Sequence, residues 1–394
     1  MADRLGKKAR EHLEVLAGEI GPRPAGSANL HKAQEYVRDR LETWGYQVDV
    51  QPIRFSRRFW LKLLYPAAGG LLVGAGLLFQ QLPVLTVGMP LTGAALPQLT
   101  RWLIRRSRLE EESQNLIARS RRVDHLQSLV FCAHLDTAPA LPYQHPLLIR
   151  LHAQRLTYYQ RAAVGVALFS LFPLLGLPLV PWADDLVAAV CILVGGWMIL
   201  SGLWEGLRQQ PAYAPGANDN ASGAAVLLSL AEYYSDHPLQ TLGVKFLFTD
   251  AEETGLDGAR AAAGRLDPDR SLVINVDQVG TGAGLGLIAR EGTLKVRRTD
   301  QQLNSVLREV HPGITDLHHT RRSGDYRPFL LAGFRVASLE AADLSRARWA
   351  YHTVDDRPEI VDTPALERAA QVLIKAAAKL DQALIDEADP AVDQ

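Results

Sequence analysis

The chain has 394 residues, a formal net charge of −1 and 22% charged residues. This balance provides no extended positive surface, which argues against a nucleic-acid partner. Its two cysteines, Cys132 and Cys191, are too few for a disulfide framework. Residues 1–27 are charged and have helical apolar spacing, so we expect no cleaved secretory leader.

Two apolar stretches interrupt the polar chain. Residues 63–100 contain no charged side chain and have Gln80–Pro83 as a turn, while residues 162–182 and 186–204 form a second uncharged pair. A membrane-spanning helix needs about 20 apolar residues, so each stretch is predicted to form a transmembrane hairpin. The alternatives are buried core helices or a dimerisation surface, and prolines outside the turn weaken the first prediction.

Positively charged residues flank both stretches on the side of the polar domain, and the predicted hairpin tips carry none. By the positive-inside rule we expect four transmembrane helices in the inner cell membrane, with the polar domain and both termini cytoplasmic. The insertions are predicted at 59–104 and 146–208. Residues 1–58, 105–145 and 209–394 then form one domain of ordinary size.

Within this domain, strand-like apolar runs alternate with segments of helical periodicity. The predicted strands are 46–55, 115–119, 129–133, 244–248, 272–276 and 336–339, and the predicted helices are 7–19, 29–45, 221–234, a segment starting at 260, 301–310 and 364–385. This alternation predicts an α/β fold with a mixed, largely parallel sheet covered by helices on both faces. Polar motifs at strand ends would form the site.

One such motif, Cys132-Ala133-His134-Leu135-Asp136, ends a predicted strand. The i, i+2 spacing places His134 and Asp136 on the same side of the chain. Asp136 could then orient the imidazole, because metal-bound histidines usually donate their second ring N–H to a carboxylate. A hydrogen-bonded surface histidine is the simpler explanation of this motif taken alone.

Two further motifs offer carboxylates. Asp219 lies at a loop-to-helix junction in Gly216–Gly223, whose small residues allow the close approach that a bridging metal ligand needs; a helix N-cap is the alternative. Glu252 and Glu253 follow an apolar strand. Adjacent residues of an extended chain face opposite ways, so one could bind metal while the other acts as general base. An acidic pair at a helix start is the alternative.

Asp277 closes another buried strand, and His352 precedes an acidic loop. Neither is informative alone. Zinc prefers imidazole and carboxylate ligands, and two ions can share one carboxylate. The combined set therefore suits a two-zinc hydrolytic centre with the ligands His134, Asp219, Glu253, Asp277 and His352.

In order and combination, these motifs resemble the bacterial dizinc aminopeptidase family, zinc exopeptidases related to glutamate carboxypeptidase II and glutaminyl cyclases. The resemblance covers residues 10–58, 109–140 and 211–385, including Gly21-Pro22-Arg23-Pro24-Ala25-Gly26-Ser27 and the run Ser323–Phe329. It does not cover the apolar insertions. The family also often has histidine where Gly324 or Asp325 stands, which leaves the substrate pocket beyond the metals open.

The resemblance implies specific roles for the motif residues. His134 and Asp277 would bind one zinc, Glu253 and His352 the other, and Asp219 would bridge them. Glu252 would be the general base, and the Asp219–Asn220 peptide would be strained and cis.

The basic segment formed by His318, His319, Arg321 and Arg322 could contact a substrate carboxylate or the tetrahedral intermediate, although a solvated loop is the alternative.

Together these observations predict a membrane-anchored dizinc metallopeptidase that hydrolyses peptide bonds as an aminopeptidase, through a zinc-activated water. Its expected partners are a peptide substrate and the lipid bilayer, and the oligomeric state stays open. The alternatives are a glutaminyl-cyclase-like zinc acyltransferase and a non-catalytic membrane scaffold. If the strands around His134 run parallel, both insertions leave near the metal centre, and membrane-proximal peptides become the expected substrates.

Overall fold

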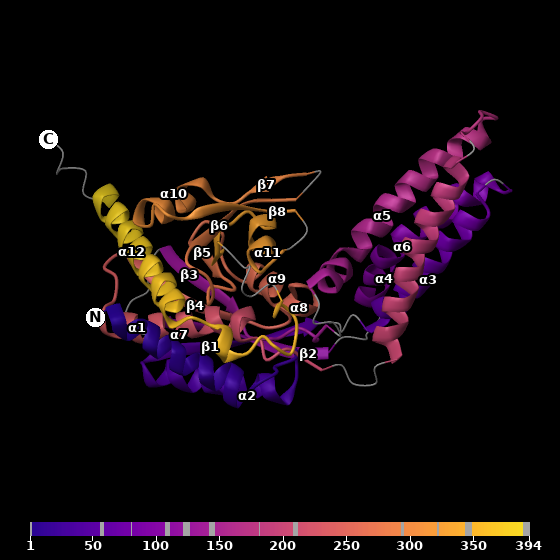
Figure 1. Cartoon of the computed structure of the whole chain (residues 1–394). Coiled ribbons are helices and arrows are strands. Elements are labelled where there is room, and N and C mark those ends of the chain that lie inside the picture. Colours follow the sequence, from indigo (N-terminus) through magenta and orange to yellow (C-terminus); the bar gives the residue numbers. More distant parts are fainter. Residues whose placement is uncertain are drawn as a thin grey trace. The chain divides into compact units, whose positions relative to one another are not determined.

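The computed structural model describes residues 2–55, 59–79, 81–106, 111–120, 127–141, 146–180, 182–207, 212–292, 295–320, 323–342 and 349–388. The chain divides into two compact units. The sheet unit comprises Met1–Phe55, Glu112–Pro142 and Ala212–Gln394, and the helical unit comprises Ser56–Glu111 and Tyr143–Pro211. Each unit is described here by itself (Figure 1).

The sheet unit is built on one mixed sheet. Its strands are β1 (Tyr46–Phe55), β2 (Glu111–Ser120), β3 (Gln127–His134), β4 (Leu242–Thr249), β5 (Ser271–Val276), β6 (Leu285–Glu291), β7 (Arg297–Arg298), β8 (Thr315–His319) and β9 (Arg335–Ala341). They are ordered β1-β2-β4-β3-β5-β9-β6-β7, with β8 paired to β6. The central strands β4, β3, β5 and β9 are parallel, whereas β2 and β6 pair antiparallel with them.

The parallel strands end together. His134 of β3 is in register with Thr249 of β4, and Val276 of β5 is in register with Leu339 of β9. These strands are apolar along most of their length because helices cover both of their faces. The chain becomes polar only where the strands stop, so the polar motifs collect at one edge of the sheet.

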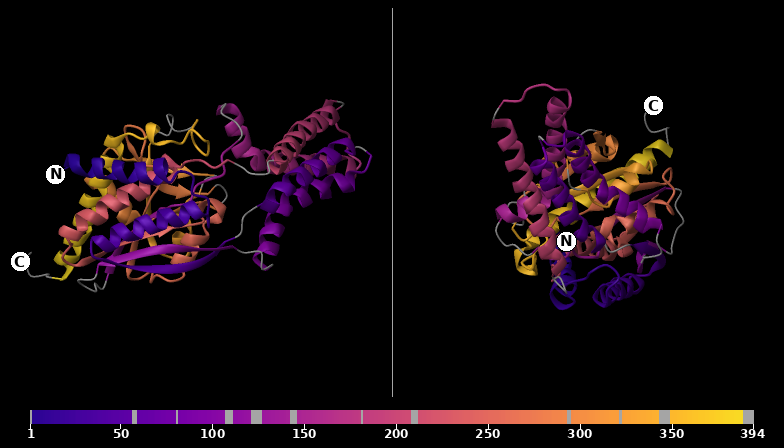
Figure 2. Two further views of the ribbon diagram at one scale, coloured as in Figure 1. Left: turned by 90° about the horizontal axis from the view of Figure 1, so that it is seen from below. Right: turned by 90° about the vertical axis from the view of Figure 1, so that its right-hand side faces the viewer.

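Two helical layers cover this sheet (Figure 1; Figure 2). On one face, Leu13, Val37, Leu227, Leu303 and Leu373 pack into the same core as Phe131 and Phe246. They belong to α1 (Ala2–Leu13), α2 (Ala28–Thr43), α7 (Ser222–Asp236), α10 (Gln301–Val310) and α12 (Thr363–Ala388). On the other face, α9 (Asp257–Ala263) and α11 (Tyr326–Leu331) pack against Val130, Leu247 and Val273. The predicted mixed α/β sheet flanked by helices is confirmed.

Short elements complete the unit: η1 (Glu14–Glu19), η2 (Ala217–Ala221), α8 (Glu252–Gly255) and η3 (Pro358–Ile360). The strands β6, β7 and β8 and the helix α11 were not predicted from the sequence. Strand β8 has the sequence Thr-Asp-Leu-His-His and β7 has only two residues, so neither carries an apolar pattern. Pairing with β6 forms them instead.

The helical unit consists of α3 (Phe59–Leu77), α4 (Pro83–Arg106), α5 (Pro146–Leu174) and α6 (Trp182–Leu207). They pack around buried side chains that include Leu72, Tyr159 and Cys191. Helices α3 and α6 cross at very short range, because a Cβ on Gly69 would lie 2.4 Å from the backbone oxygen of Gly195. Glycine at both positions therefore permits this crossing.

The expectation of two transmembrane hairpins needs correction. Among the described residues, one helical segment, Trp182–Trp204, is long and apolar enough to cross a membrane, with 23 residues and a mean hydropathy of 2.3. The apolar segments Leu64–Leu77 and Val84–Leu96 are shorter than the 20 or so residues that a span needs. Much of α5 is occupied by polar and basic residues before its apolar part begins at Ala162. Four spans and a cytoplasmic orientation are therefore not supported.

Candidate metal centre

Two groups of potential metal ligands lie at the carboxyl edge of the parallel strands. The first is His134, Asp219 and Asp277; the second is Asp219, Glu253 and His352. Within each group the ligand atoms lie within 4.8 Å of one another. All five residues expected as ligands are thus brought together, and Asp219 is shared.

The shared carboxylate divides its oxygens between two histidines. Asp219 Oδ1 lies 3.3 Å from His134 Nε2, and Asp219 Oδ2 lies 3.2 Å from His352 Nε2. Two ligand atoms on a tetrahedral zinc, each about 2.0–2.1 Å from the ion, are about 3.4 Å apart. The spacing on each side of Asp219 therefore fits a carboxylate that bridges two ions.

The first ligand group comes from neighbouring strands. His134 is the last residue of β3 and Asp277 directly follows β5, and these strands are parallel neighbours. His134 Nε2 lies 3.7 Å from Asp277 Oδ1, an oxygen that is buried and has no hydrogen-bond partner among the described residues. Buried polar atoms normally have a hydrogen-bond partner, so this oxygen is suited to bind a cation instead.

The second ligand group comes from a short helix and a loop. Glu253 lies in the first turn of α8, and its Oε1 is 3.3 Å from His352 Nε2. Both segments use left-handed backbone, with a φ of 58° at Ala251 just before α8 and 55° at His352 itself. Such conformations are uncommon outside glycine and cluster at functional sites.

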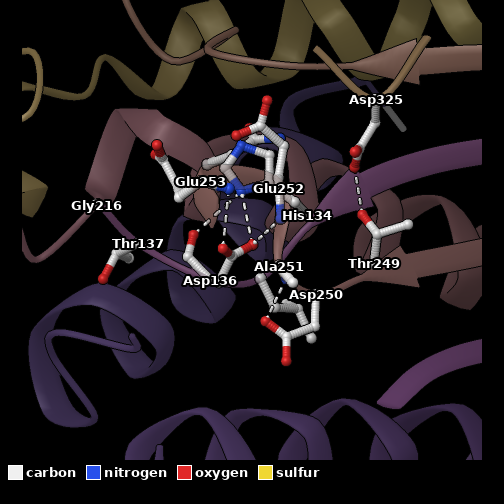
Figure 3. Close-up of polar contacts among 12 residues, drawn as sticks. His134, Asp136, Thr137, Gly216, Thr249, Asp250, Ala251, Glu252, Glu253 and Asp325 are labelled. Atoms are coloured by element: carbon white, nitrogen blue, oxygen red, sulfur yellow. Dashed lines mark hydrogen bonds and ion pairs between the residues drawn. The ribbon is translucent and has the colours of Figure 1, made fainter. Parts of the chain in front are cut away.

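Asp136 supports both glutamates as well as His134 (Figure 3). The backbone N–H groups of Glu252 and Glu253 donate to its two carboxylate oxygens, each at 3.1 Å. His134 Nδ1 lies 3.1 Å from the backbone oxygen of Asp136 and 3.5 Å from its Oδ1. Asp136 was expected to orient the imidazole; in the structure its backbone oxygen is the nearer partner of the ring, and its carboxylate holds the start of α8.

The site is crowded with negative charge. Burial raises the pKa of Glu252 well above its usual value, and Glu253 reinforces this against the opposing effect of His134. Burial likewise raises the pKa values of Glu253 and Asp277. Carboxylates with raised pKa values take up protons unless cations neutralise them, which two divalent ions would do.

The pKa shifts of the two histidines and of the shared aspartate favour their charged forms, since the histidine values are raised and the Asp219 value is lowered. Burial lowers the pKa of His352, but Glu253 and Asp219 outweigh it and raise the value to about 10. Burial also lowers the pKa of His134, and its hydrogen bonds with Asp136, Asp219 and Asp277 raise it well above normal. Hydrogen bonds from both histidines lower the pKa of Asp219 despite its burial. The carboxylates around each imidazole therefore attract a cation strongly, as a metal site requires.

Arg23 is a central residue to which the sequence pattern alone assigned no role. It is fully buried, and its Nε donates to Leu135 O at 2.9 Å, in the turn between His134 and Asp136. Its guanidinium also donates to Pro215 O at 2.9 Å and Gly216 O at 3.1 Å, just before Asp219. Two further bonds reach Leu16 O and Gly21 O. Arg23 therefore ties the loop that carries one ligand to the loop that carries the bridging ligand.

The charge of Arg23 persists in this setting. Burial lowers its pKa to about 10, while Asp356, Asp136 and Asp219 act to raise it. The side chain is thus cationic at neutral pH. In the sequence, the segment Gly21-Pro22-Arg23-Pro24 contributed only to the family resemblance. The feature that could have indicated a role for Arg23 is its position as a single cationic side chain between two prolines.

The loop of Asp219 has two more supports. Asp356 accepts from the backbone N–H of Asn218 at 2.7 Å and of Asp219 at 3.1 Å. Asn220 Nδ2 donates to Val276 O at 2.8 Å, which links this loop to the end of β5 beside Asp277. The Asp219–Asn220 peptide is cis, as the resemblance implied.

The expected substrate-contacting segment is only partly close to the site. His319 Nε2 lies 3.2 Å from Oε2 of the buried Glu340, which follows Leu339, the register partner of Val276. His318 instead faces a backbone oxygen, that of Gly292, at 2.8 Å. Neither histidine belongs to the ligand groups.

Arg321 and Arg322 lie outside the described residues.

Gly324 and Asp325 stand where relatives were expected to have histidine. A Cβ on Gly324 would lie 3.4 Å from Asp277 Oδ2, an ordinary van der Waals contact, so position 324 lies directly beside this expected ligand. Asp325 is fully buried and accepts from the Thr249 hydroxyl (Figure 3). Burial raises its pKa to about 7.

The fold is a mixed α/β sheet flanked by helices, and comparisons with solved structures find the same fold among zinc exopeptidases and glutaminyl cyclases. The sheet architecture resembles BSAP, a zinc aminopeptidase from Bacillus subtilis, with a TM-score of 0.55, 16% identity, 95% of this chain covered and 94% of that chain covered. It also resembles the glutaminyl cyclase of Fimbriiglobus ruber, with a TM-score of 0.56, 16% identity and 94% of each chain covered. At such low identities the likeness shows the fold alone.

Sequence comparison narrows the assignment. Residues 197–377 match the sequence model of peptidase family M28, a segment that contains Asp219, Glu252, Glu253, Asp277 and His352. Aminopeptidase YwaD of Bacillus subtilis (strain 168) is 30% identical over 177 residues, which are 42% of this chain and 37% of that protein. The chain thus matches less than half of this curated relative's length. The expected resemblance to zinc exopeptidases is confirmed.

Proposed function

We propose that this protein is a dizinc metallopeptidase that removes the amino-terminal residue of peptides. The observation that carries the proposal is the position of Asp219, with one oxygen toward His134 and the other toward His352. A carboxylate with each oxygen beside a different imidazole is the arrangement expected of a ligand shared by two ions. The match to peptidase family M28 supports peptide hydrolysis as the reaction.

The ligand set that we propose follows the two groups of donors. His134 and Asp277 would hold one ion, Glu253 and His352 the other, and Asp219 both. When bound, zinc supplies Lewis acidity that activates water and polarises a carbonyl group. The donor chemistry of two imidazoles and three carboxylates fits zinc.

Glu252 is the residue that we propose to move the proton. It adjoins the ligand Glu253, and its N–H is fixed by Asp136, so the side chain starts from a defined position. In its carboxylate form it takes a proton from the attacking water, and it then gives that proton to the nitrogen of the leaving amine. Burial raises the pKa of Glu252, which makes its carboxylate a stronger proton acceptor.

The substitution Glu252→Gln tests this role. We expect the variant to keep its zinc and to lose about 10²- to 10⁴-fold in kcat, because an amide cannot carry the proton. The measurement is hydrolysis of aminoacyl-p-nitroanilides, together with metal analysis. Glu359→Gln, at an exposed position in η3, is the matched control. Near-normal hydrolysis by the Glu252 variant at full metal content would remove Glu252 from the mechanism.

A glutaminyl-cyclase activity is the second candidate, favoured by the structural likeness to the Fimbriiglobus ruber enzyme. It would release ammonia from peptides with amino-terminal glutamine and would not cleave peptide bonds. The presence of both histidines and the shared aspartate favours the dizinc peptidase. Incubation of one peptide with amino-terminal glutamine distinguishes the two reactions by product mass.

Membrane association is a further part of the proposal. Helix α6 carries leucine and tryptophan side chains on its outer surface, with Leu193 73% exposed, Leu200 67% and Trp204 56%. Large apolar patches are rare on surfaces that face water. We propose that Trp182–Trp204 inserts into a lipid bilayer.

A further inference from the structure

A second cavity lies in the sheet unit, away from the strands that end at the metal ligands. It has a volume of about 360 Å³ and is lined by side chains of β6, β7, α10 and β8, including Arg290, Arg298, Asn304, Arg308 and Asp316. In the strand order, β6 and β7 lie at the opposite end of the sheet from β1 and β2 (Figure 1). Small-molecule sites have cavities of comparable size.

The lining carries three guanidinium groups and one carboxylate. Arg308 already has an ion-pair partner, because its Nη2 donates to both carboxylate oxygens of Asp316, at 2.8 and 3.0 Å. Arg290 and Arg298 are paired directly across the antiparallel β6–β7 ladder. Neither has an ion-pair partner among the residues that the structure describes.

Two like charges directly opposite each other destabilise a strand pair. A two-residue strand has few ladder bonds to offset that cost, since β7 consists only of Arg297 and Arg298. An anion between Arg290 and Arg298 would reverse the sign of this interaction. Both side chains are exposed and together carry two positive charges, which matches the charge of a dianion.

Asn304, one of the residues that line the cavity, carries an unsatisfied acceptor. The Thr299 hydroxyl donates to Ile288 O at 2.6 Å, so its lone pairs accept from Asn304 Nδ2 at 2.8 Å. This fixes the orientation of the Asn304 amide and leaves its buried Oδ1 without a partner within the described ranges. Buried acceptors of this kind are normally satisfied. A ligand of the cavity would therefore bring a hydrogen-bond donor as well as negative charge.

We propose that this cavity binds a small phosphomonoester that carries a hydroxyl group. Its phosphate, with a charge of about −1.5 to −2 at neutral pH, would lie between the guanidinium groups of Arg290 and Arg298, whose planar forks fit phosphate oxygens. The ligand hydroxyl would donate to Asn304 Oδ1. This site is independent of the proposed peptidase activity and calls for no metal.

Calorimetric titration of the full-length protein with glycerol 3-phosphate tests the proposal. We expect one saturable site that the double variant Arg290→Gln/Arg298→Gln weakens at least about tenfold, because charged hydrogen bonds are lost. Arg297→Gln removes the same type of charge from the adjacent position of β7, which does not line the cavity, and should leave the affinity unchanged. The variant Asp219→Asn, altered in the metal centre, should also bind normally.

Three results would overturn it. Equal affinity of the double variant and the wild type would show that the ligand binds elsewhere, for example at the metal centre. Equal weakening by Arg297→Gln would reduce the effect to general surface charge. Binding of inorganic phosphate as tight as that of glycerol 3-phosphate would remove the role of the hydroxyl and of Asn304.

Discussion

At the scale of single residues, the centre depends on how each side chain is held in place. Asp219 can face two imidazoles because both it and the next residue are held in place. Asp356 accepts from the backbone N–H of Asp219, and the side chain of Asn220 donates to Val276 O at the end of β5. Asp136 fixes the start of α8 in the same way, through the N–H groups of Glu252 and Glu253. Such supporting residues keep metal ligands oriented before the metal arrives.

Arg23 is the residue that connects these supports, and its removal should affect the metal centre more than the fold. We expect Arg23→Lys to weaken zinc affinity and kcat about 10- to 100-fold, because lysine has three donors in place of five and cannot reach both ligand loops. Zinc affinity is measured by competition with a chelator, and kcat and KM are measured separately. The expected loss lies in kcat.

Arg10→Lys is the matched control, since Arg10 also donates to two backbone oxygens, those of Pro358 and Val361, outside the ligand loops. It should lower the melting temperature without changing kcat. If Arg23→Lys behaved like this control, with normal zinc affinity and kcat, Arg23 would be a purely structural residue.

At the scale of elements, parallel strands that end together explain why distant motifs meet. His134, Thr249 and Val276 close three adjacent strands, and the residues that follow them supply most of the site. The sequence predicted these strands because their apolar runs stop at polar residues. It could not predict β7 or β8, which have no apolar pattern and depend on pairing with β6. It also could not predict the second cavity, which those strands help to form.

Helix α6 permits a direct test of membrane insertion. We expect the wild type to resist alkaline carbonate extraction and the double variant Leu193→Arg/Leu200→Arg to be released. An arginine at the centre of the span, where Leu193 lies, costs about 2.5–3.5 kcal/mol on insertion, and the second arginine adds to this cost. Leu331→Arg, at a leucine that is 54% exposed in the sheet unit, is the control and should stay with the membrane. Retention of the double variant in the pellet would contradict insertion of α6.

At the scale of the whole molecule, a long insertion separates His134 from Asp219 in the sequence without separating them in the sheet unit. The chain leaves after Leu141 and returns at Ala212, and these two ends are paired: Ala140 N donates to Ala212 O at 2.7 Å and Ala214 N to Ala138 O at 3.0 Å. Leu141 N also donates to His352 O at 2.7 Å. Closing a longer loop costs little extra entropy once its ends are fixed.

The same scale shows where sequence reasoning reached its limit. Apolar composition predicted two insertions, and it overestimated the number of spans because the apolar parts of α3, α4 and α5 are short. The ligand types could be predicted because histidine and carboxylate side chains are among the few ligands that zinc prefers. The division of the Asp219 oxygens between two histidines depends on how separate segments pack, which a linear pattern does not contain.

The central claim, that one chain binds two zinc ions through a shared Asp219, is tested by metal content. Mass-spectrometric metal analysis of the purified protein should give two zinc ions per chain, with hydrolysis lost on chelation and restored by zinc. Asp219→Asn, which weakens one ligand of each ion, should lower both the metal content and the activity. A fully active protein with a single zinc ion, or an Asp219→Asn variant that retains two ions and full activity, would contradict the account.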